Sequence, residues 1–375
     1  MKLTQRIDRR LTFVVDVAVF VLLLAATGLG WFASLLIAEG VSWLVRLVWL
    51  SPALLQFILR RLVSIVPILL IVIALGFILV ELAPGDAFSQ LDVTPGIDPA
   101  FVDRIRDQFG VGQPWHERFF RYIWNAVRGD FGYSATYRTP VFALVSQRAT
   151  NTLLLAVTAL VFAWGISIPL GVIAATKQYK WQDQALSVVA FVGLAIPNFF
   201  LAFLLIYLIA TTGIPLPLGG MRSLDSNLFG PLRAALDIAR HMIVPVFVLG
   251  TSAMASLTRV MRANMLDVLG QQYVVTARSK GQTERKVVYR HALRNAINPM
   301  ITILGFQLGA IMSGTPLVEA VLAWPGLGQL ILQALLSQDT YLVVGSLIYG
   351  VILLMLGNLV ADIMLALADP RIRIS

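Results

Sequence analysis

The segment RVMRANMLDVLGQQYVVTARSKGQTERKVVYRHALRNAINP, residues 259–299, is a long charged stretch between two apolar ones. It contains eight basic residues and only two acids, Asp267 and Glu284. Such a bias marks a loop on the cytoplasmic side of a membrane. The segment therefore predicts an inner loop that orients the whole chain. Its basic residues are Arg259, Arg262, Arg278, Lys280, Arg285, Lys286, Arg290 and Arg294.

Apolar residues of this loop recur at helical spacing on both sides of Gly281. A glycine between two helical patterns is typical of a helix end followed by a turn. We therefore expect one helix before Gly281 and another after it. The pattern is carried by Leu266, Leu269, Tyr273 and Ala277 before the glycine, and by Val287, Val288, Ala292 and Ile297 after it.

The same loop resembles the EAA loop of ATP-binding-cassette (ABC) importer permeases, in the form of the dipeptide, oligopeptide and nickel family. Basic inner loops are common, so the resemblance depends on the run TARSKG followed by RHALRN. The family's Glu-Ala-Ala corresponds to residues 275–277, where the acid is absent, and Pro299 matches a downstream proline. The resemblance implies a short helix that docks into a groove of an ATPase subunit. The ATPase-coupling candidates are Val275, Thr276, Ala277, Arg278, Lys280 and Gly281.

The composition indicates an all-α, polytopic membrane protein. Of 375 residues, 58% are hydrophobic and 13% are charged, and the mean hydropathy is +0.80. The net charge of +9 fits membrane orientation and lipid head groups better than nucleic acid, because basic residues flank apolar spans. Without cysteine, and with three scattered histidines, the sequence predicts no metal site.

Six core spans are expected in a permease domain of residues 55–375, which the resemblance implies has the type I ABC importer transmembrane fold. Residues 1–54 are expected to form an apolar extension. It crosses the membrane once, or twice as a hairpin of 11–38 and 41–58, or lies in the interface without crossing. Its basic start predicts a cytoplasmic N-terminus. The expected core spans are 62–82, 152–176, 185–211, 242–258, 300–317 and 341–367.

Residues 84–150 are expected to form an outer subdomain that touches a substrate-capturing protein. Apolar residues at helical spacing predict two amphipathic helix faces, one of Phe101, Ile105 and Phe109, the other of Phe120, Trp124 and Val127. The segments A-P-G-D at 83–86 and G-D-F-G-Y-S at 129–134 are similar to elements of the same family.

Two further places are pore or gate candidates. Pro197 and Asn198 break an apolar stretch. Irregular backbone at membrane depth is tolerated only beside protein or water, so this break is a candidate for lining the pore. A simple kink at Pro197 is an equal alternative. The second lies in E-x-V-x-x-W-P-G-L-G at 319–328, an outer segment that is similar to a specific signature of these importers. There Trp324 is expected in an interfacial aromatic belt. The candidates of this segment are Glu319, Trp324, Pro325 and Gly326.

The sequence thus predicts the permease subunit of an ABC importer in a bacterial or archaeal cytoplasmic (inner) membrane, not an enzyme. The expected partners are a second homologous permease, two ABC ATPase subunits and a substrate-binding protein. Because the chain has no G-x-x-x-x-G-K-[ST] motif, ATP and Mg²⁺ are expected on the partners and no cofactor on this chain. The alternative is a gradient-driven secondary transporter or channel, which usually needs ionisable groups at mid-membrane. The cargo is not determined by the sequence.

Overall fold

The computed structural model describes residues 52–82, 100, 104 and 113–368. The chain divides into two compact units, residues 1–66 with 370–375 and residues 67–369, and each is considered by itself. The first unit is described only from residue 52, where helix α3 (Pro52–Leu82) begins. The predicted extension, its crossings and the N-terminus therefore lie almost wholly outside the described residues.

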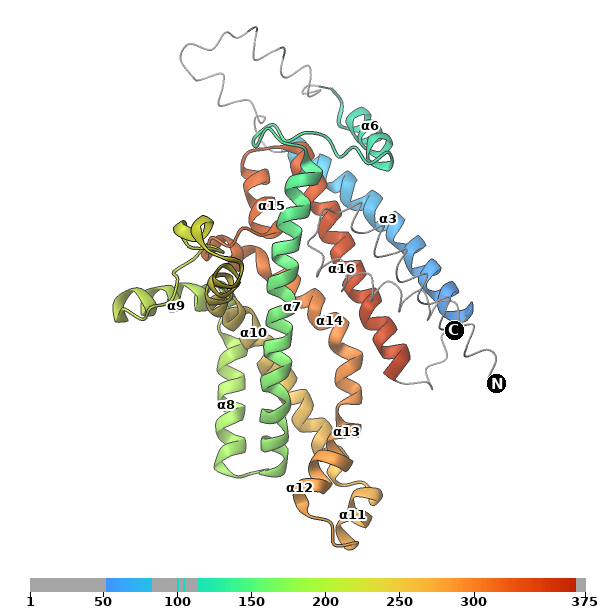
Figure 1. Cartoon of the computed structure of the whole chain (residues 1–375). Coiled ribbons are helices and arrows are strands. Elements are labelled where there is room, and N and C mark those ends of the chain that lie inside the picture. The colour runs from blue at the N-terminus through green and yellow to red at the C-terminus, as the bar shows by residue number, and fades with distance from the viewer. Residues whose placement is uncertain (1–51, 83–99, 101–103, 105–112, 369–375) are drawn as a thin grey trace. The chain divides into compact units, whose positions relative to one another are not determined.

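The described residues are helical and contain no strand, which confirms the predicted all-α class (Figure 1). A single isolated bridge joins Tyr133 and Pro140. The elements after α3 are α6 (Trp115–Val127), α7 (Val141–Thr176), α8 (Trp181–Ala195), α9 (Asn198–Thr212), the 3₁₀ helix η1 (Leu224–Leu228), α10 (Pro231–Leu269), α11 (Gln272–Ser279), α12 (Glu284–Lys286), the π-helix η2 (Val287–Ala292), α13 (Leu293–Ala296), α14 (Asn298–Val321), α15 (Leu327–Leu336) and α16 (Thr340–Ala368).

Four described helices are long and apolar enough to cross a membrane, and the pair α8–α9 makes five if it is one span. The four segments are Val63–Val80, Val141–Thr176, Pro231–Leu269 and Thr340–Leu359. Helix α14 coincides with the fifth predicted span, 300–317, and its 24 residues reach about 36 Å, enough for the ~30 Å core.

Several helices extend beyond the predicted spans, because a helix can continue through polar residues after its apolar part ends. Helix α7 starts at Val141 and not near 152. Residues 231–241, which lie between the predicted spans 185–211 and 242–258, form the start of α10, and α10 runs on to Leu269 inside the predicted inner loop. Helix α15 was not predicted.

The core of the second unit lies where α7 and α10 pack closely. Small residues allow this approach, since a Cβ added to Gly171 of α7 would lie 2.5 Å from the Met261 Cβ. A Cβ on Gly250 of α10 would overlap the Phe162 ring. The fully buried side chains here include Leu155, Ala156, Ala159 and Ala163 of α7 and Val248, Leu249 and Leu257 of α10.

The stretch predicted as one span at 185–211 is bent by 102° between α8 and α9. Ile196 ends α8, and Pro197 precedes the first residue of α9. Because proline has no N–H and restricts the residue before it, a sharp break at this point follows from the sequence.

The outer subdomain is described only in part, and the predicted face of Phe101, Ile105 and Phe109 lies outside it. In α6 the predicted apolar face is exposed in this chain, with Phe120 at 68% and Trp124 at 62%. The opposite side packs inward. Tyr122 lies edge-on to Phe77 of α3, with ring centroids 5.7 Å apart, and stacks on Tyr341 of α16 at 6.0 Å. The partly buried residues Phe119, Ile123 and Ala126 join the same cluster.

Candidate functional site

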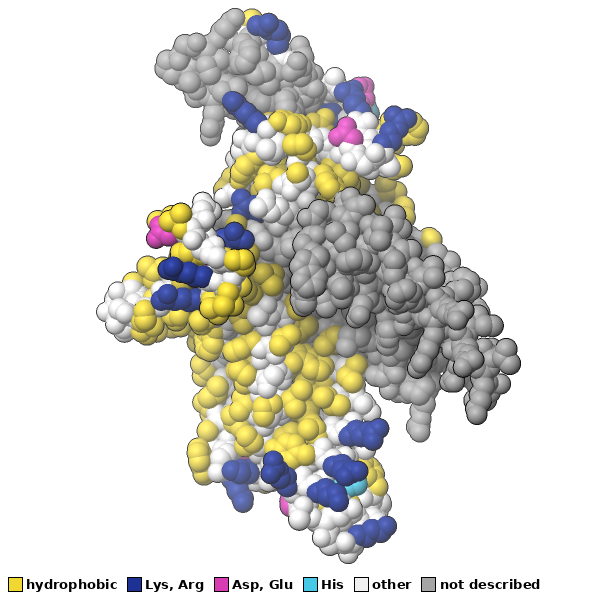
Figure 2. Space-filling view, viewed as in Figure 1, with side chains coloured by type: hydrophobic (Ala, Val, Ile, Leu, Met, Phe, Trp, Pro, Cys, Tyr) yellow, Lys and Arg dark blue, Asp and Glu magenta, His cyan; other side chains and the backbone are white. Residues whose placement is uncertain are grey.

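Helices α11 to α13 lie at one end of the second unit, near the turn between α7 and α8 (Figure 1). Figure 2 shows Lys and Arg side chains gathered at this end, beyond a broad apolar surface over α7 and α8. An apolar wall with a basic end is the expected surface of a chain that spans a membrane, with this end on the cytoplasmic side.

The turn predicted at Gly281 is confirmed and has a defined hydrogen-bond pattern. Gly281 has φ +74°, which an L side chain rarely adopts. The Gln282 N–H donates to the Ala277 carbonyl at 3.4 Å, and the Gly281 N–H donates to the Arg278 carbonyl at 2.9 Å. These two bonds form the Schellman motif that ends a helix with a left-handed residue.

One face of α11 packs inside the chain. Val274 is fully buried and Ala277 is 6% exposed, in the cluster that contains Val287, Val288 and Ala292 of the π-helix. The small Ala277 side chain therefore packs against this chain's own π-helix, and its part in the contact with an ATPase subunit stays a prediction. π-Helices are rare and often occur at functional sites.

The other face of α11 is open. Val275 is 45% exposed and Tyr273 is 43% exposed, whereas Val274 and Ala277 are buried. This face combines apolar, hydroxyl and cationic side chains within eight residues of helix. Its exposed residues are Gln272, Tyr273, Val275, Thr276, Arg278 and Ser279, followed by Lys280.

Side-chain bonds hold the loop in shape around α11. Arg278 binds Glu284 through two hydrogen bonds, from Nη2 to Oε1 at 2.7 Å and from Nε to Oε2 at 3.1 Å. These bonds hold the pKa of the Glu284 carboxyl below its usual value. Asn295 Nδ2 donates to the Tyr273 hydroxyl at 2.7 Å. The turn is thus preformed before any partner binds.

The second candidate place is a buried polar junction between α14 and α15. The Glu319 carboxylate is fully buried and accepts bonds from the Thr152 hydroxyl at 2.7 Å and from the Gln329 N–H at 3.0 Å. The Leu327 N–H donates to the same Thr152 oxygen at 2.7 Å. Glu319 and Thr152 therefore satisfy amide groups at the start of α15, which have no partner within that helix.

The W-P-G residues of the motif, 324–326, pack against this junction. Trp324 is fully buried, and its Nε1 donates to the Asn151 carbonyl at 3.2 Å, so its assignment to an interfacial belt was wrong. Asn151 Nδ2 donates to the Pro325 carbonyl at 2.8 Å. A Cβ on Gly326 would overlap the Glu319 carboxylate. In this conformation Glu319 and Trp324 are packed within the chain, which favours a structural role over an open gate.

Pro197 and Asn198 lie elsewhere, at the bend between α8 and α9. Pro197 is exposed and Asn198 is half-buried. The Pro197 carbonyl accepts the Leu201 N–H at 3.0 Å, as the first bond of α9. The pore role of these two residues stays a prediction.

Sequence reasoning missed a third junction, where G-D-F-G-Y-S meets the turn before α16. The Ser134 hydroxyl donates to Asp339 Oδ2 at 2.6 Å, and the Thr136 N–H donates to the same oxygen at 3.0 Å. The Leu342 N–H donates to Oδ1 at 3.2 Å. Ser134 and Asp339 are 205 residues apart, so no local pattern pointed to the contact.

The fold and the inner loop together define a polytopic helical membrane protein with a short, partly exposed helix at its basic end. Comparison with known proteins gives the family. The chain belongs to the family of binding-protein-dependent transport system inner membrane components, which it matches over residues 167–374. The N-terminal region of the same class of membrane component matches residues 54–158.

Three relatives illustrate the branch. The chain is 39% identical over 319 residues to the oligopeptide transport system permease protein AppB of Bacillus subtilis, covering 84% of this chain and 98% of the relative. It is 35% identical to the dipeptide permease DppB of Escherichia coli over 335 residues, covering 85% and 99%. It is 34% identical to the glutathione permease GsiC of Escherichia coli over 319 residues, covering 85% and 99%.

Among solved structures, an inward-facing form of the MetNI methionine ABC transporter superimposes with a TM-score of 0.46 at 18% identity. The superposition covers 61% of this chain and 97% of that chain. The family membership makes this chain a membrane permease subunit of an ABC importer rather than an ATPase. A gradient-driven transporter is set aside on the same ground.

Proposed function

We propose that the chain forms half of a translocation path for short peptides or peptide-like solutes. The support is the agreement of three relatives, whose names give oligopeptide, dipeptide and glutathione transport. The proposed assembly contains a second related permease, two ATPase subunits that hold ATP and Mg²⁺, and an outer substrate-binding protein. The family supports the ATPase and binding-protein partners, and the second permease and the subunit numbers belong to the proposal.

The main support for the coupling role is that α11 has one buried face and one exposed face. Its inner face is fixed by packing on the π-helix, and its outer face presents Val275, Thr276 and Lys280. A contact that transmits force must be rigid on one side and accessible on the other. In this proposal an ATPase subunit binds the outer face, and Gly281 sets the direction in which the chain leaves it.

The test uses two lysines of the same loop. Lys280 follows α11 and Lys286 ends α12, and both are exposed. We expect Lys280→Glu and Val275→Asp to reduce ATPase copurification about tenfold, because charge mismatch and desolvation weaken a contact. Lys286→Glu makes the same charge change outside α11 and should leave copurification unchanged. Equal losses for both lysine variants would show only a general charge effect.

A second test concerns the outer subdomain, which we propose contacts the substrate-binding protein. Trp124 projects from α6 with the Arg128 guanidinium 4.3 Å from its ring centre. Exposed tryptophan and arginine are typical of contact hot spots. Trp124→Ala should weaken capture of the binding protein, whereas Trp181→Ala, at the exposed start of α8, should not. Unchanged binding for Trp124→Ala would contradict this role of α6.

The cargo is best identified through the binding protein. Its copurification with the intact permease and mass spectrometry of the molecules it holds should give short peptides or peptide-like compounds. A bound sugar or a free metal ion would contradict the proposed cargo class while leaving the permease role intact.

A further inference from the structure

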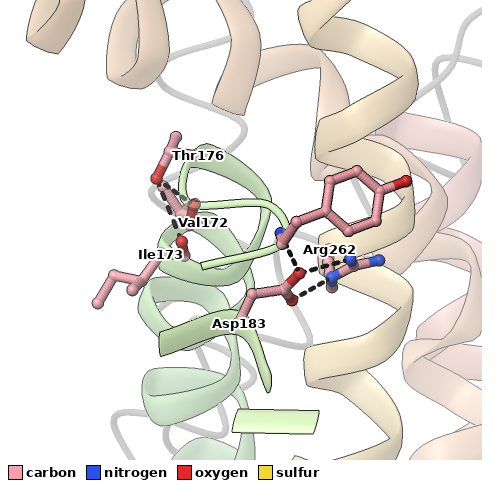
Figure 3. A network of polar contacts seen from close by, with 6 residues as sticks. Val172, Ile173, Thr176, Asp183 and Arg262 are labelled. Atoms are coloured by element: carbon pink, nitrogen blue, oxygen red, sulfur yellow. Dashed lines mark hydrogen bonds and ion pairs between the residues drawn. The ribbon is translucent and has the colours of Figure 1, made fainter. Parts of the chain in front are cut away.

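An ion pair links two segments that are 79 residues apart in sequence, beside the inner turn between α7 and α8 (Figure 3). Arg262 of α10 donates from Nε to Asp183 Oδ1 at 2.6 Å and from Nη2 to Oδ2 at 2.8 Å. The Tyr179 N–H also donates to Oδ2, at 3.0 Å. Asp183, which is 4% exposed, thus connects the turn, the start of α8 and α10 through one carboxylate.

Helix α8 lies along α7 and α10, but most of its side chains are partly or fully exposed. Its only buried residues are Asp183 and Ala190. Farther along, its contact with α10 is made by small groups, since a Cβ on Gly193 would lie 3.2 Å from the Thr251 methyl group and 3.5 Å from the Ala255 Cβ. Apolar helix faces gain little by leaving lipid for one another. The bidentate pair is therefore the specific interaction that holds this end of α8 on α10.

The α10 side of the pair leads directly to the coupling element. Arg262 lies seven residues before the end of α10 at Leu269, and α11 begins at Gln272. Asn264 Nδ2, two residues beyond Arg262, donates to the Ala296 carbonyl of α13 at 3.2 Å. The segment of α10 around Arg262 thus leads into α11 and is also hydrogen-bonded to α13.

We infer that Asp183 and Arg262 are positioning residues that make α8 and its inner turn move as one body with α10 and α11. This inference depends on the proposed coupling role of α11. When the ATPase subunits displace α11, the pair carries the displacement to α8 and so to the bend at Pro197. Without the pair, α10 moves and α8 stays behind, so ATP is hydrolysed with little transport.

The first test separates coupling from assembly. Asp183→Asn keeps the shape of the side chain and removes its charge, and Arg262→Lys keeps the charge and removes the two-pronged geometry. We expect about tenfold less transport per ATP hydrolysed in Asp183→Asn, because the Arg262 guanidinium loses the carboxylate that accepts both of its hydrogen bonds. Arg262→Lys should show a smaller loss, and both variants should retain copurifying ATPase subunits. The control is Asp267→Asn, which changes an exposed carboxylate on the same helix.

The second test measures the distance across the pair and does not need Asp183→Asn. The chain has no cysteine, so single cysteines can be introduced for labelling without background. Spin labels at exposed positions 180, in the turn, and 263, on α10, report the distance across the pair. We expect the same distance in the resting and the ATP-trapped wild-type complex, and a broader distribution when Arg262→Lys is added. A distance that changes with ATP in the wild type would overturn the inference.

The outcomes distinguish this inference from the proposed function. Wild-type permease that binds no ATPase subunit would overturn the coupling role of α11. If the wild type couples normally and Asp183→Asn transports equally well, only the role of the pair is overturned. If Asp183→Asn does not accumulate in membranes, the distance measurement still decides.

Discussion

The inner turn at Gly281 and the outer turn at Gly326 both belong to motifs that mark the family, yet their surroundings are opposite. A Cβ on Gly281 would meet no atom within 4 Å, whereas one on Gly326 would overlap the Glu319 carboxylate. The inner turn requires glycine because its φ is +74°, whereas the outer turn requires glycine because there is no space for a side chain. The difference indicates that the inner motif is open to another protein and the outer motif holds this chain together.

The same contrast appears in the polar groups. Around Glu319 the hydrogen-bonding groups pair with one another inside the chain. Around α11, residues such as Thr276 and Lys280 stay exposed. A motif can therefore identify a family without showing whether its residues bind a partner or pack internally. The four changes below test this contrast, from the largest expected effect to the smallest.

The largest effect is expected from Gly326→Ala. The added methyl group has to displace a carboxylate that is held through both of its oxygens, so the variant combines the loss of both bonds with overpacking, which by itself costs about 1–3 kcal/mol. We expect low accumulation in membranes and a clearly reduced thermal midpoint in detergent. The matched change is Gly281→Ala, where the space is open and only the backbone angle opposes the methyl group. Similar stability of the two variants would contradict the contrast.

Glu319→Ala is expected to come second. It leaves the buried Thr152 hydroxyl and the Gln329 N–H without their acceptor, at about 1–3 kcal/mol for each lost partner. Glu319→Gln retains one acceptor oxygen, so its thermal midpoint should lie between those of the wild type and Glu319→Ala. Because the removed carboxylate makes room, Gly326→Ala should be less harmful in the Glu319→Ala background. Simple additivity of the two effects would argue against direct contact.

Gly281→Val should have a smaller effect on stability and a larger one on coupling. A β-branched residue at positive φ costs about 1–2 kcal/mol, and Asn tolerates this region. We expect Gly281→Val to insert normally but to lose cargo-stimulated ATP hydrolysis, and Gly281→Asn to behave as the wild type. If both variants couple normally, the turn does not set the direction of α11.

The smallest effect is expected from Glu284→Gln, which removes the exposed pair with Arg278. Exposed pairs contribute about 0.2–1 kcal/mol, and salt screens them. Since the folded-state pKa of Glu284 is lowered, the pair stabilises the loop at neutral pH and loses this effect only as the pH falls below 4.5, through the folded pKa. Thermal midpoints at low and high salt should therefore differ slightly for the wild type and not for the variant. A large loss at neutral pH would show that this bond is more than a surface contact.

The sequence could predict features that depend on neighbouring residues alone. Apolar length placed the spans, since a membrane core requires about 20 apolar residues whatever they pack against. The charge bias of 259–299 placed the inner loop, and glycine and proline placed the turn at Gly281 and the break at Pro197. These features are local, so no other part of the chain was needed to infer them.

Only the tertiary structure decided which faces are buried. Helix α6 has a wide apolar sector, and the position of α3 and α16 determines that Tyr122 points inward and Trp124 outward. Likewise, the π-helix determines that Ala277 is covered. The contacts Thr152–Glu319, Ser134–Asp339 and Asp183–Arg262 each join residues 79 or more positions apart. Hydrophobic periodicity repeats every few residues and contains no information on which distant polar groups meet, so these junctions became visible only in the folded chain.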